Sequence, residues 1–115
     1  MRKWFNSFGH ALAGVLLFFK TERNARIELV FACIAILLSV WFQISLLEFC
    51  IILLCIAAVF SAEAFNSAIE RLADVQSQRL DPRIKAIKDI AAGGVLMVAV
   101  VSVIIGIIIM LPKIL

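Results

Sequence analysis

Three long stretches of the chain contain no charged residue, and their lengths predict membrane-spanning helices. No Asp, Glu, Lys or Arg occurs across 29–47 or across 90–112. The uncharged stretch 49–62 is shorter, but its helical pattern continues into Glu63. A helix needs about 20 mostly apolar residues to cross a bilayer. The expected transmembrane helices cover about 27–45, 46–72 and 84–111.

Residues 1–20 have a different pattern, which is typical of a helix lying in the membrane interface. Apolar side chains recur at spacings of three and four, at Trp4, Phe5, Phe8, Leu12, Val15, Leu16 and Phe19. The other positions include Arg2, Lys3, Asn6 and His10. The segment as a whole is too mixed in polarity to span a bilayer, so we expect a surface helix anchored by aromatic side chains. A signal peptide is less favoured because the apolar face is periodic rather than continuous.

Local motifs predict where several helices begin and end. Ser45, followed three residues later by Glu48, is typical of a capping box at a helix start. Asp81 before Pro82 predicts an N-cap followed by proline at the first helical position. Pro112 is expected to end the last helix.

Composition restricts the class of protein. The chain has 115 residues, of which 64% are apolar and 17% charged. Soluble domains are usually about 45–50% apolar, so a water-soluble monomer and a disordered chain are both excluded. Three cysteines are too few for a disulfide-stapled secreted domain. The predicted fold is therefore all-α and integral to the membrane, with one membrane domain over 1–115.

The basic residues predict the orientation of the helices in the membrane. Five precede the first span, none lies between the first two, and one follows the third. The remaining five are Arg71, Arg79, Arg83, Lys85 and Lys88. Because positive charge marks cytoplasmic loops, we expect a cytoplasmic amino terminus and a carboxyl terminus outside. The net charge of +3 agrees with contact to anionic lipid, and no nucleic-acid partner is expected.

Polar side chains form a stripe on the inner half of the second span. At 100° per residue, Glu63, Asn66, Glu70 and Asp74 fall within about 80° of one another. Carboxylates from separate helices, with a lysine nearby, are suited to hold Mg²⁺ and nucleotide phosphates. The chain has no Gly-rich phosphate loop of either common type. The stripe alone leaves alternatives open: a solvated helix face, a proton-coupled exporter using Glu63, or a non-catalytic membrane subunit.

Two longer motifs resemble a known family. Residues 63–74, EAFNSAIERLAD, resemble the ExxNTAIExxxD motif of the prokaryotic diacylglycerol kinase family, which includes the small undecaprenol kinases. Residues 85–96, KAIKDIAAGGVL, resemble its KxxKDxAAGAVL motif, and 22–24 resemble the ERN segment of the undecaprenol-kinase branch. The departures from the family pattern are Ser67 for threonine, Gly94 for alanine, and Asp81 where histidine is common.

The resemblance implies a homotrimeric lipid kinase of the bacterial cytoplasmic membrane. Each protomer would have three transmembrane helices and an amino-terminal surface helix. The substrates would be ATP, with Mg²⁺ as cofactor, and a membrane lipid alcohol, for which the ERN segment favours undecaprenol over diacylglycerol.

The resemblance also implies roles for individual residues. By motif position, Glu63 is similar to the family's general base, and Glu22 and Glu70 to its metal ligands. The implied ATP-binding residues are Lys88 and Asp89, with Lys3 and His10 on the surface helix and Arg79, Leu80 and Asp81 in the loop. The residues implied to orient or bind the substrate are Asn66, Asn24, Arg26 and Glu28.

Overall fold

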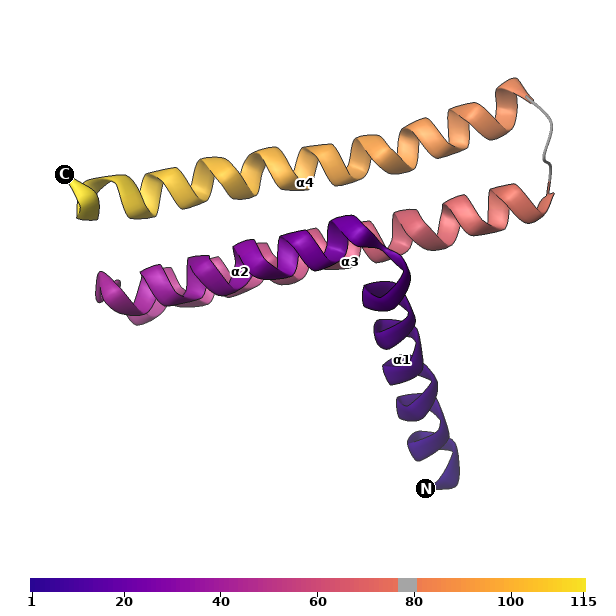
Figure 1. The fold of residues 1–115 in the computed structure, drawn as a ribbon, viewed down its shortest axis with the longest axis horizontal. Helices are drawn as coiled ribbons and strands as arrows, with labels where there is room; N and C mark the ends of the chain where they lie inside the picture. The colour runs from indigo at the N-terminus through magenta and orange to yellow at the C-terminus, as the bar shows by residue number, and fades with distance from the viewer. Residues whose placement is uncertain (77–80) are drawn as a thin grey trace.

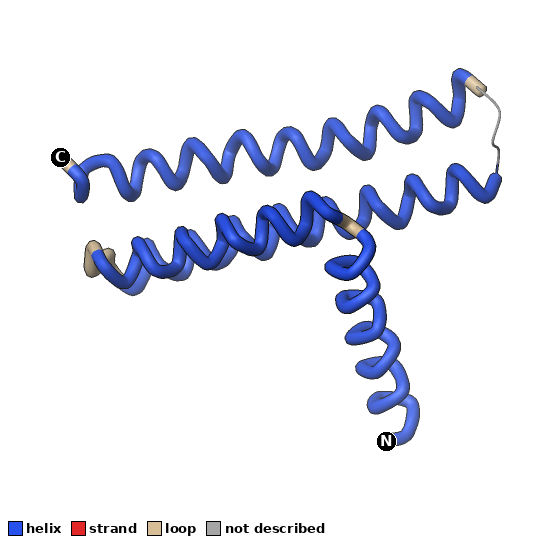
Figure 2. The backbone as a smooth tube through the Cα atoms, in the orientation of Figure 1, coloured by secondary structure: helices blue, strands red, loops and turns tan. Residues whose placement is uncertain are grey.

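The computed structural model describes residues 1–76 and 81–115, and this part of the chain forms four helices (Figures 1 and 2). The helices are α1 (Arg2–Thr21), α2 (Arg23–Trp41), α3 (Leu46–Gln76) and α4 (Pro82–Ile114). All of α2, α3 and α4 are long and apolar enough to cross a membrane. The prediction of an all-α membrane fold with three spans and an amino-terminal helix is confirmed.

The helix α1 runs crosswise to the other three helices (Figure 1). The two helices α1 and α2 are separated only by Glu22, whose backbone is extended at φ −99° and ψ 107°. The Arg26 guanidinium donates to the carbonyl oxygens of Phe19 and Lys20, at 2.9 and 2.7 Å. Because these carbonyls belong to the last turn of α1, where no helical N–H follows, Arg26 caps that helix and stabilises the corner.

The helix that contains most of the first uncharged stretch begins and ends earlier than the expected span. We expected a helix over about 27–45, whereas α2 begins at Arg23 and ends at Trp41. Of the charged residues near its start, Arg26 is turned back onto the end of α1. At the other end, Gln43 adopts φ 51°, which the α-helix does not allow.

The turn between α2 and α3 contains the predicted capping box. The backbone N–H of Ser45 donates to Glu48 Oε1 at 3.0 Å, and the N–H of Glu48 donates to Ser45 Oγ at 3.1 Å. Glu48 Oε1 also lies 3.6 Å from Lys113 Nζ. The start of α3 is thereby linked to the end of α4.

The two proline predictions for α4 have different outcomes. Asp81 is the N-cap, its Oδ1 accepting from the backbone N–H of Arg83 at 2.8 Å, with Pro82 in the first turn. The expectation that Pro112 ends the helix is wrong, because α4 continues to Ile114. Proline removes one N–H donor and crowds the carbonyl four residues earlier. Both effects concern the turn before the proline, so the residues after Pro112 can stay helical.

The helices α2 and α4 both pack on α3, and α3 makes its most extensive contacts with α4. Most large apolar side chains on these helices remain exposed, as expected for surfaces that face lipid. At 1.5 Å per residue, residues 46–66 of α3 already cover about 30 Å, the thickness of the hydrocarbon core. The end of α3 and the start of α4 therefore extend past the level at which α1 branches off (Figure 1).

Candidate active site

A cavity of about 180 Å³ lies where the α1–α2 corner meets α3 and α4. Its lining residues are Phe18, Glu22, Asn24, Ala25, Glu63, Asn66, Ser67, Glu70, Ala92 and Val95. We call it the acidic cavity, because it brings the carboxylate of Glu22 together with those of Glu63 and Glu70, which come much later in the sequence. Five of the residues expected from the family resemblance line it: Glu22, Asn24, Glu63, Asn66 and Glu70.

Glu22 reaches the cavity because it is the single extended residue at the α1–α2 corner. Its Oε1 accepts a hydrogen bond from Ser67 Oγ at 2.6 Å and lies 3.8 Å from Arg71 Nη2. Ser67 is only 8% exposed. Sequence analysis gave Ser67 no role, although its place in the motif next to Asn66 was a signal that could have identified it.

Glu63, Asn66 and Glu70 lie on successive turns of one face of α3, which explains their common access to the cavity. Among the described residues, Glu63 Oε2, Asn66 Oδ1 and Glu28 Oε2 are buried without a hydrogen-bond partner. Buried polar atoms without partners are costly, so this part of the cavity is suited to bind a polar group or a cation.

The expected Mg²⁺ would need carboxylate oxygens from the residues that line the acidic cavity. In the described part of the chain, no three His, Cys, Asp or Glu side chains are grouped so as to hold a metal ion. Glu22 and Glu70 nevertheless line the same cavity. Protein sites for Mg–nucleotide commonly use one or two carboxylates, with phosphate and water oxygens completing the shell. The donor set therefore fits Mg²⁺ bound together with a nucleotide.

Lys88 and Asp89 on α4 are not among the residues that line the acidic cavity. Lys88 Nζ donates to Asp74 Oδ1, which joins α4 to α3, and Asp89 accepts from Lys85 Nζ at 2.7 Å. Sequence analysis placed Asp74 on the polar stripe without a role of its own. In the structure, Asp74 accepts a hydrogen bond from Lys88.

Other expected nucleotide contacts lie away from the cavity or outside the described residues. Lys3 and His10 are exposed on α1, which extends away from α3 and α4 toward its amino terminus (Figure 1). Arg79 and Leu80 lie outside the described residues. Asp81 caps α4, and the hydrogen bonds from the side chain and backbone of Arg83 hold the pKa of Asp81 below its usual range.

Three of the residues expected on the substrate side lie in three different places. Asn24 lines the acidic cavity, whereas the guanidinium of Arg26 binds the carbonyls at the end of α1. Glu28 also lines an apolar groove of about 290 Å³ between α2, α3 and α4. Structural contacts thus account for Arg26, while Asn24 and Glu28 remain available to a ligand.

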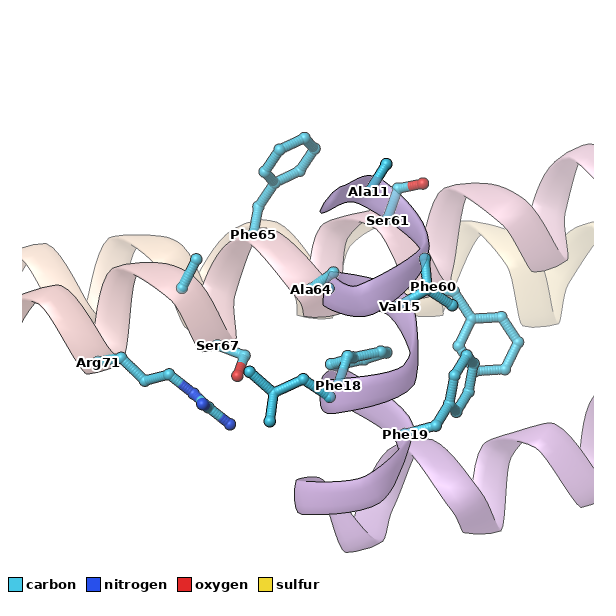
Figure 3. A pocket seen from close by; sticks show the side chains of 13 residues that line it. Ala11, Val15, Phe18, Phe19, Phe60, Ser61, Ala64, Phe65, Ser67 and Arg71 are labelled. Carbon is cyan, nitrogen blue, oxygen red and sulfur yellow. The ribbon is translucent and has the colours of Figure 1, made fainter. Parts of the chain in front are cut away.

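A larger pocket of about 680 Å³ lies between α1 and α3 (Figure 3). We call it the corner pocket. Its walls are mostly apolar and include Phe18, Phe19 and Phe60, with Ser67 and Arg71 among the few polar residues. The rings of Phe19 and Phe60 meet edge to face, with centroids 5.3 Å apart. Phe18 and Ser67 line both spaces, so the corner pocket adjoins the acidic cavity.

Comparisons with known proteins agree with the motifs. A family model described as prokaryotic diacylglycerol kinase matches residues 9–110. An undecaprenol kinase of Bacillus subtilis is 40% identical over 113 residues, which are 98% of this chain and 92% of that protein. A diacylglycerol kinase of Synechocystis is 33% identical over 110 residues, which are 95% of this chain and 63% of that protein. The exporter hypothesis is not favoured by these matches. The chain belongs to the prokaryotic diacylglycerol kinase family, a family of lipid kinases.

Proposed function

We propose that this chain transfers the γ-phosphoryl group of ATP to the hydroxyl group of a membrane lipid alcohol. Undecaprenol is the favoured acceptor and diacylglycerol the alternative. The similar protein named undecaprenol kinase supports this order, because the match spans nearly the whole of both chains. The ERN segment at 22–24 supports it as well.

The acidic cavity is the observation that carries this proposal. Glu22, Glu63 and Glu70 come from two different segments of the chain and line one space. The cavity adjoins the apolar corner pocket and lies at the α1–α2 corner. A site for phosphorylating a lipid needs this combination, because a polar phosphate and a hydrophobic acceptor must meet at one point.

We assign Glu63 the role of general base. Its Oε2 is buried and has no partner among the described residues, and so it can accept the proton of an incoming hydroxyl group. Asn66, one turn further along α3, orients the acceptor or the phosphoryl group. Asn24 and Glu28 border the same region on α2 and contribute to binding the head end of the lipid.

We assign Glu22 and Glu70 to Mg²⁺, which when bound with ATP would neutralise charge on the phosphates. Lys88 and Asp89 bind the nucleotide on its outer side, with Asp81, Arg79 and Leu80 in the adjoining segment. For this role Lys88 has to exchange Asp74 for a phosphate oxygen. That exchange replaces one anionic partner by another, and so it leaves the ammonium group paired.

The assembly is proposed to be a homotrimer in the bacterial cytoplasmic membrane, with the amino terminus on the cytoplasmic side. The geometry of α1 supports an assembly with shared sites. This helix contains Lys3 and His10, and toward its amino terminus it extends away from α3 and α4 of its own chain (Figure 1). Nucleotide contacts from these two residues would therefore reach the site of a neighbouring protomer.

The test is phosphorylation of a panel of lipid alcohols by the purified, membrane-reconstituted protein with radiolabelled ATP. We expect Mg²⁺-dependent labelling, strongest with undecaprenol. Glu63→Gln should lower kcat about 10²- to 10⁴-fold, the usual contribution of a general base. The control Glu48→Gln removes a carboxylate at the other end of α3 and should retain activity, because glutamine also completes a capping box. A folded protein that labels no lipid would refute the proposed function, and full turnover by Glu63→Gln would refute the assignment of the base.

A further inference from the structure

We propose that Arg71 binds a phosphate group on the lipid side of the site and thereby holds the phosphorylated lipid product. Sequence analysis treated Arg71 only as a basic residue that marks the cytoplasmic side. The inference rests on the proposed function and adds a residue that recognises the head end of the lipid.

Arg71 stands at the boundary between the two adjoining spaces. It lines the corner pocket (Figure 3), and its Nη2 lies 3.8 Å from Glu22 Oε1, which belongs to the acidic cavity. The same Nη2 donates to the hydroxyl group of Thr21 at the end of α1. A group passing from the acidic cavity into the corner pocket would therefore meet this guanidinium.

The contacts that hold Arg71 are weak enough to be exchanged. The Arg71 and Glu22 side chains are 48% and 38% exposed, and their separation is at the long end of an ion pair. Exposed pairs of this kind contribute little to stability. The Thr21 hydroxyl is a neutral acceptor, which binds a guanidinium less strongly than an anion does.

The reaction itself would create the ligand that Arg71 is suited to bind. A lipid alcohol is neutral at its head, whereas its phosphate monoester carries a charge of about −1.5 to −2 near neutral pH. The planar guanidinium can donate two parallel hydrogen bonds to phosphate oxygens. The apolar walls formed by Phe18, Phe19 and Phe60 would accommodate the first carbon atoms of the lipid chain.

The position of Arg71 favours the phosphate of the lipid over a phosphate of ATP. Arg71 lines the corner pocket and is not among the residues that line the acidic cavity. A guanidinium that served the nucleotide would be expected on the acidic side, beside Glu70. Substitution of Arg71 should therefore weaken binding of the lipid phosphate and leave the KM for ATP close to its original value.

The experiment compares Arg71→Gln and Arg71→Lys in reconstituted vesicles, with the KM for ATP and inhibition by added lipid phosphate as readouts. We expect Arg71→Gln to raise the inhibition constant of the lipid phosphate about ten- to hundredfold, as loss of a charge-assisted hydrogen bond would. Arg71→Lys should restore part of it, because charge remains but the two-pronged geometry is lost. Inorganic phosphate serves as a second inhibitor. Because it lacks the lipid chain, it should inhibit the wild type far more weakly than the lipid phosphate does, and any inhibition through this site should also weaken in Arg71→Gln.

Two further variants separate binding from a structural role. Thr21→Val removes the hydroxyl group that Arg71 contacts but leaves the guanidinium, so inhibition by the lipid phosphate should stay near wild type. Arg2→Gln removes an exposed cation on α1 and controls for a general change of charge. If Thr21→Val reproduced the effect of Arg71→Gln, Arg71 would only tie α1 to α3, and the proposal would be wrong.

The remaining outcomes are equally decisive. An unchanged inhibition constant in Arg71→Gln, or a rise confined to the KM for ATP, would overturn the inference while leaving the lipid kinase intact. Absence of lipid labelling by the wild-type protein would instead overturn the proposed function. Both results come from the same preparation and cannot be confused.

Discussion

Replacing Ser67 by alanine is expected to weaken activation by Mg²⁺, although Ser67 itself is not proposed to touch the ion. Its hydroxyl donates to Glu22 Oε1 at 2.6 Å, and this bond joins residues 45 positions apart. Glu22 is one of the two proposed metal ligands, and it is the single residue with an extended backbone between α1 and α2. Without Ser67 Oγ, the described contact that remains for this carboxylate is Arg71 at 3.8 Å. The carboxylate would then sample positions outside the cavity.

The size of the effect can be derived from that one bond. A hydrogen bond to a charged group contributes about 1.5–3 kcal/mol. Because Glu22 is 38% exposed, water replaces part of the lost interaction, and the low end of this range is appropriate. About 1.4 kcal/mol corresponds to a factor of ten, so the concentration of Mg²⁺ needed for half-maximal activity should rise about tenfold.

The assay is the Mg²⁺ dependence of lipid phosphorylation at saturating ATP, with thermal unfolding measured in parallel. Ser67→Thr is the matched control, because it retains the hydroxyl and restores the residue that is usual in the family motif. We expect Ser67→Thr to behave like the wild type and Ser67→Ala to fold with a modestly lower unfolding temperature, because the lost hydrogen bond outweighs the gain in helix propensity. An unaltered Mg²⁺ requirement in a folded Ser67→Ala protein would refute the positioning role.

Two further predictions concern the ends of helices. Arg26→Ala should lower the unfolding temperature, because the carbonyls of Phe19 and Lys20 lose their guanidinium donor. Circular dichroism during heating would measure the shift. An unchanged midpoint would show that the α1–α2 corner is stable without this cap. Asp81→Asn should be less stable than the wild type at neutral pH, and this difference in the free energy of unfolding should shrink as the pH falls below about 4. The sign follows because Arg83 lowers the pKa of Asp81 in the folded state, so that the carboxylate stabilises α4 only while it is ionised. A pH-independent difference, measured by unfolding at several pH values, would contradict this.

Features that depend on neighbours in the sequence could be predicted from the sequence. The capping box joins Ser45 and Glu48, which are three positions apart, and Asp81 caps a helix that starts at the next residue. Each motif works through the backbone of its own turn, so no other part of the chain has to be known. The number of membrane spans can also be predicted from the sequence, because it depends on the lengths of the uncharged stretches.

Features that depend on packing between helices could not be predicted in the same way. The spacing on α3 predicts a common face for Glu63 and Glu70, but no spacing predicts that Glu22 bonds to Ser67. The contact of Lys88 could not be predicted either, because its sequence motif does not indicate that it donates a hydrogen bond to Asp74. The start of α2 at Arg23 could not be predicted either, because only the fold turns Arg26 back onto α1.

The buried atoms without partners support an acceptor that brings a hydrogen-bond donor. Glu63 Oε2, Glu28 Oε2 and Asn66 Oδ1 are all oxygen atoms, and among the described residues none of them has a donor. Leaving such atoms unsatisfied costs about 1–3 kcal/mol each, so a ligand that donates a hydrogen bond gains more here than in water. A lipid alcohol can donate its hydroxyl proton, whereas a lipid esterified at that oxygen cannot. The same three oxygens would disfavour the phosphorylated product, whose negative charge would lie beside them. Repulsion on the acidic side and a guanidinium on the side of the corner pocket would therefore act together to move the product toward Arg71.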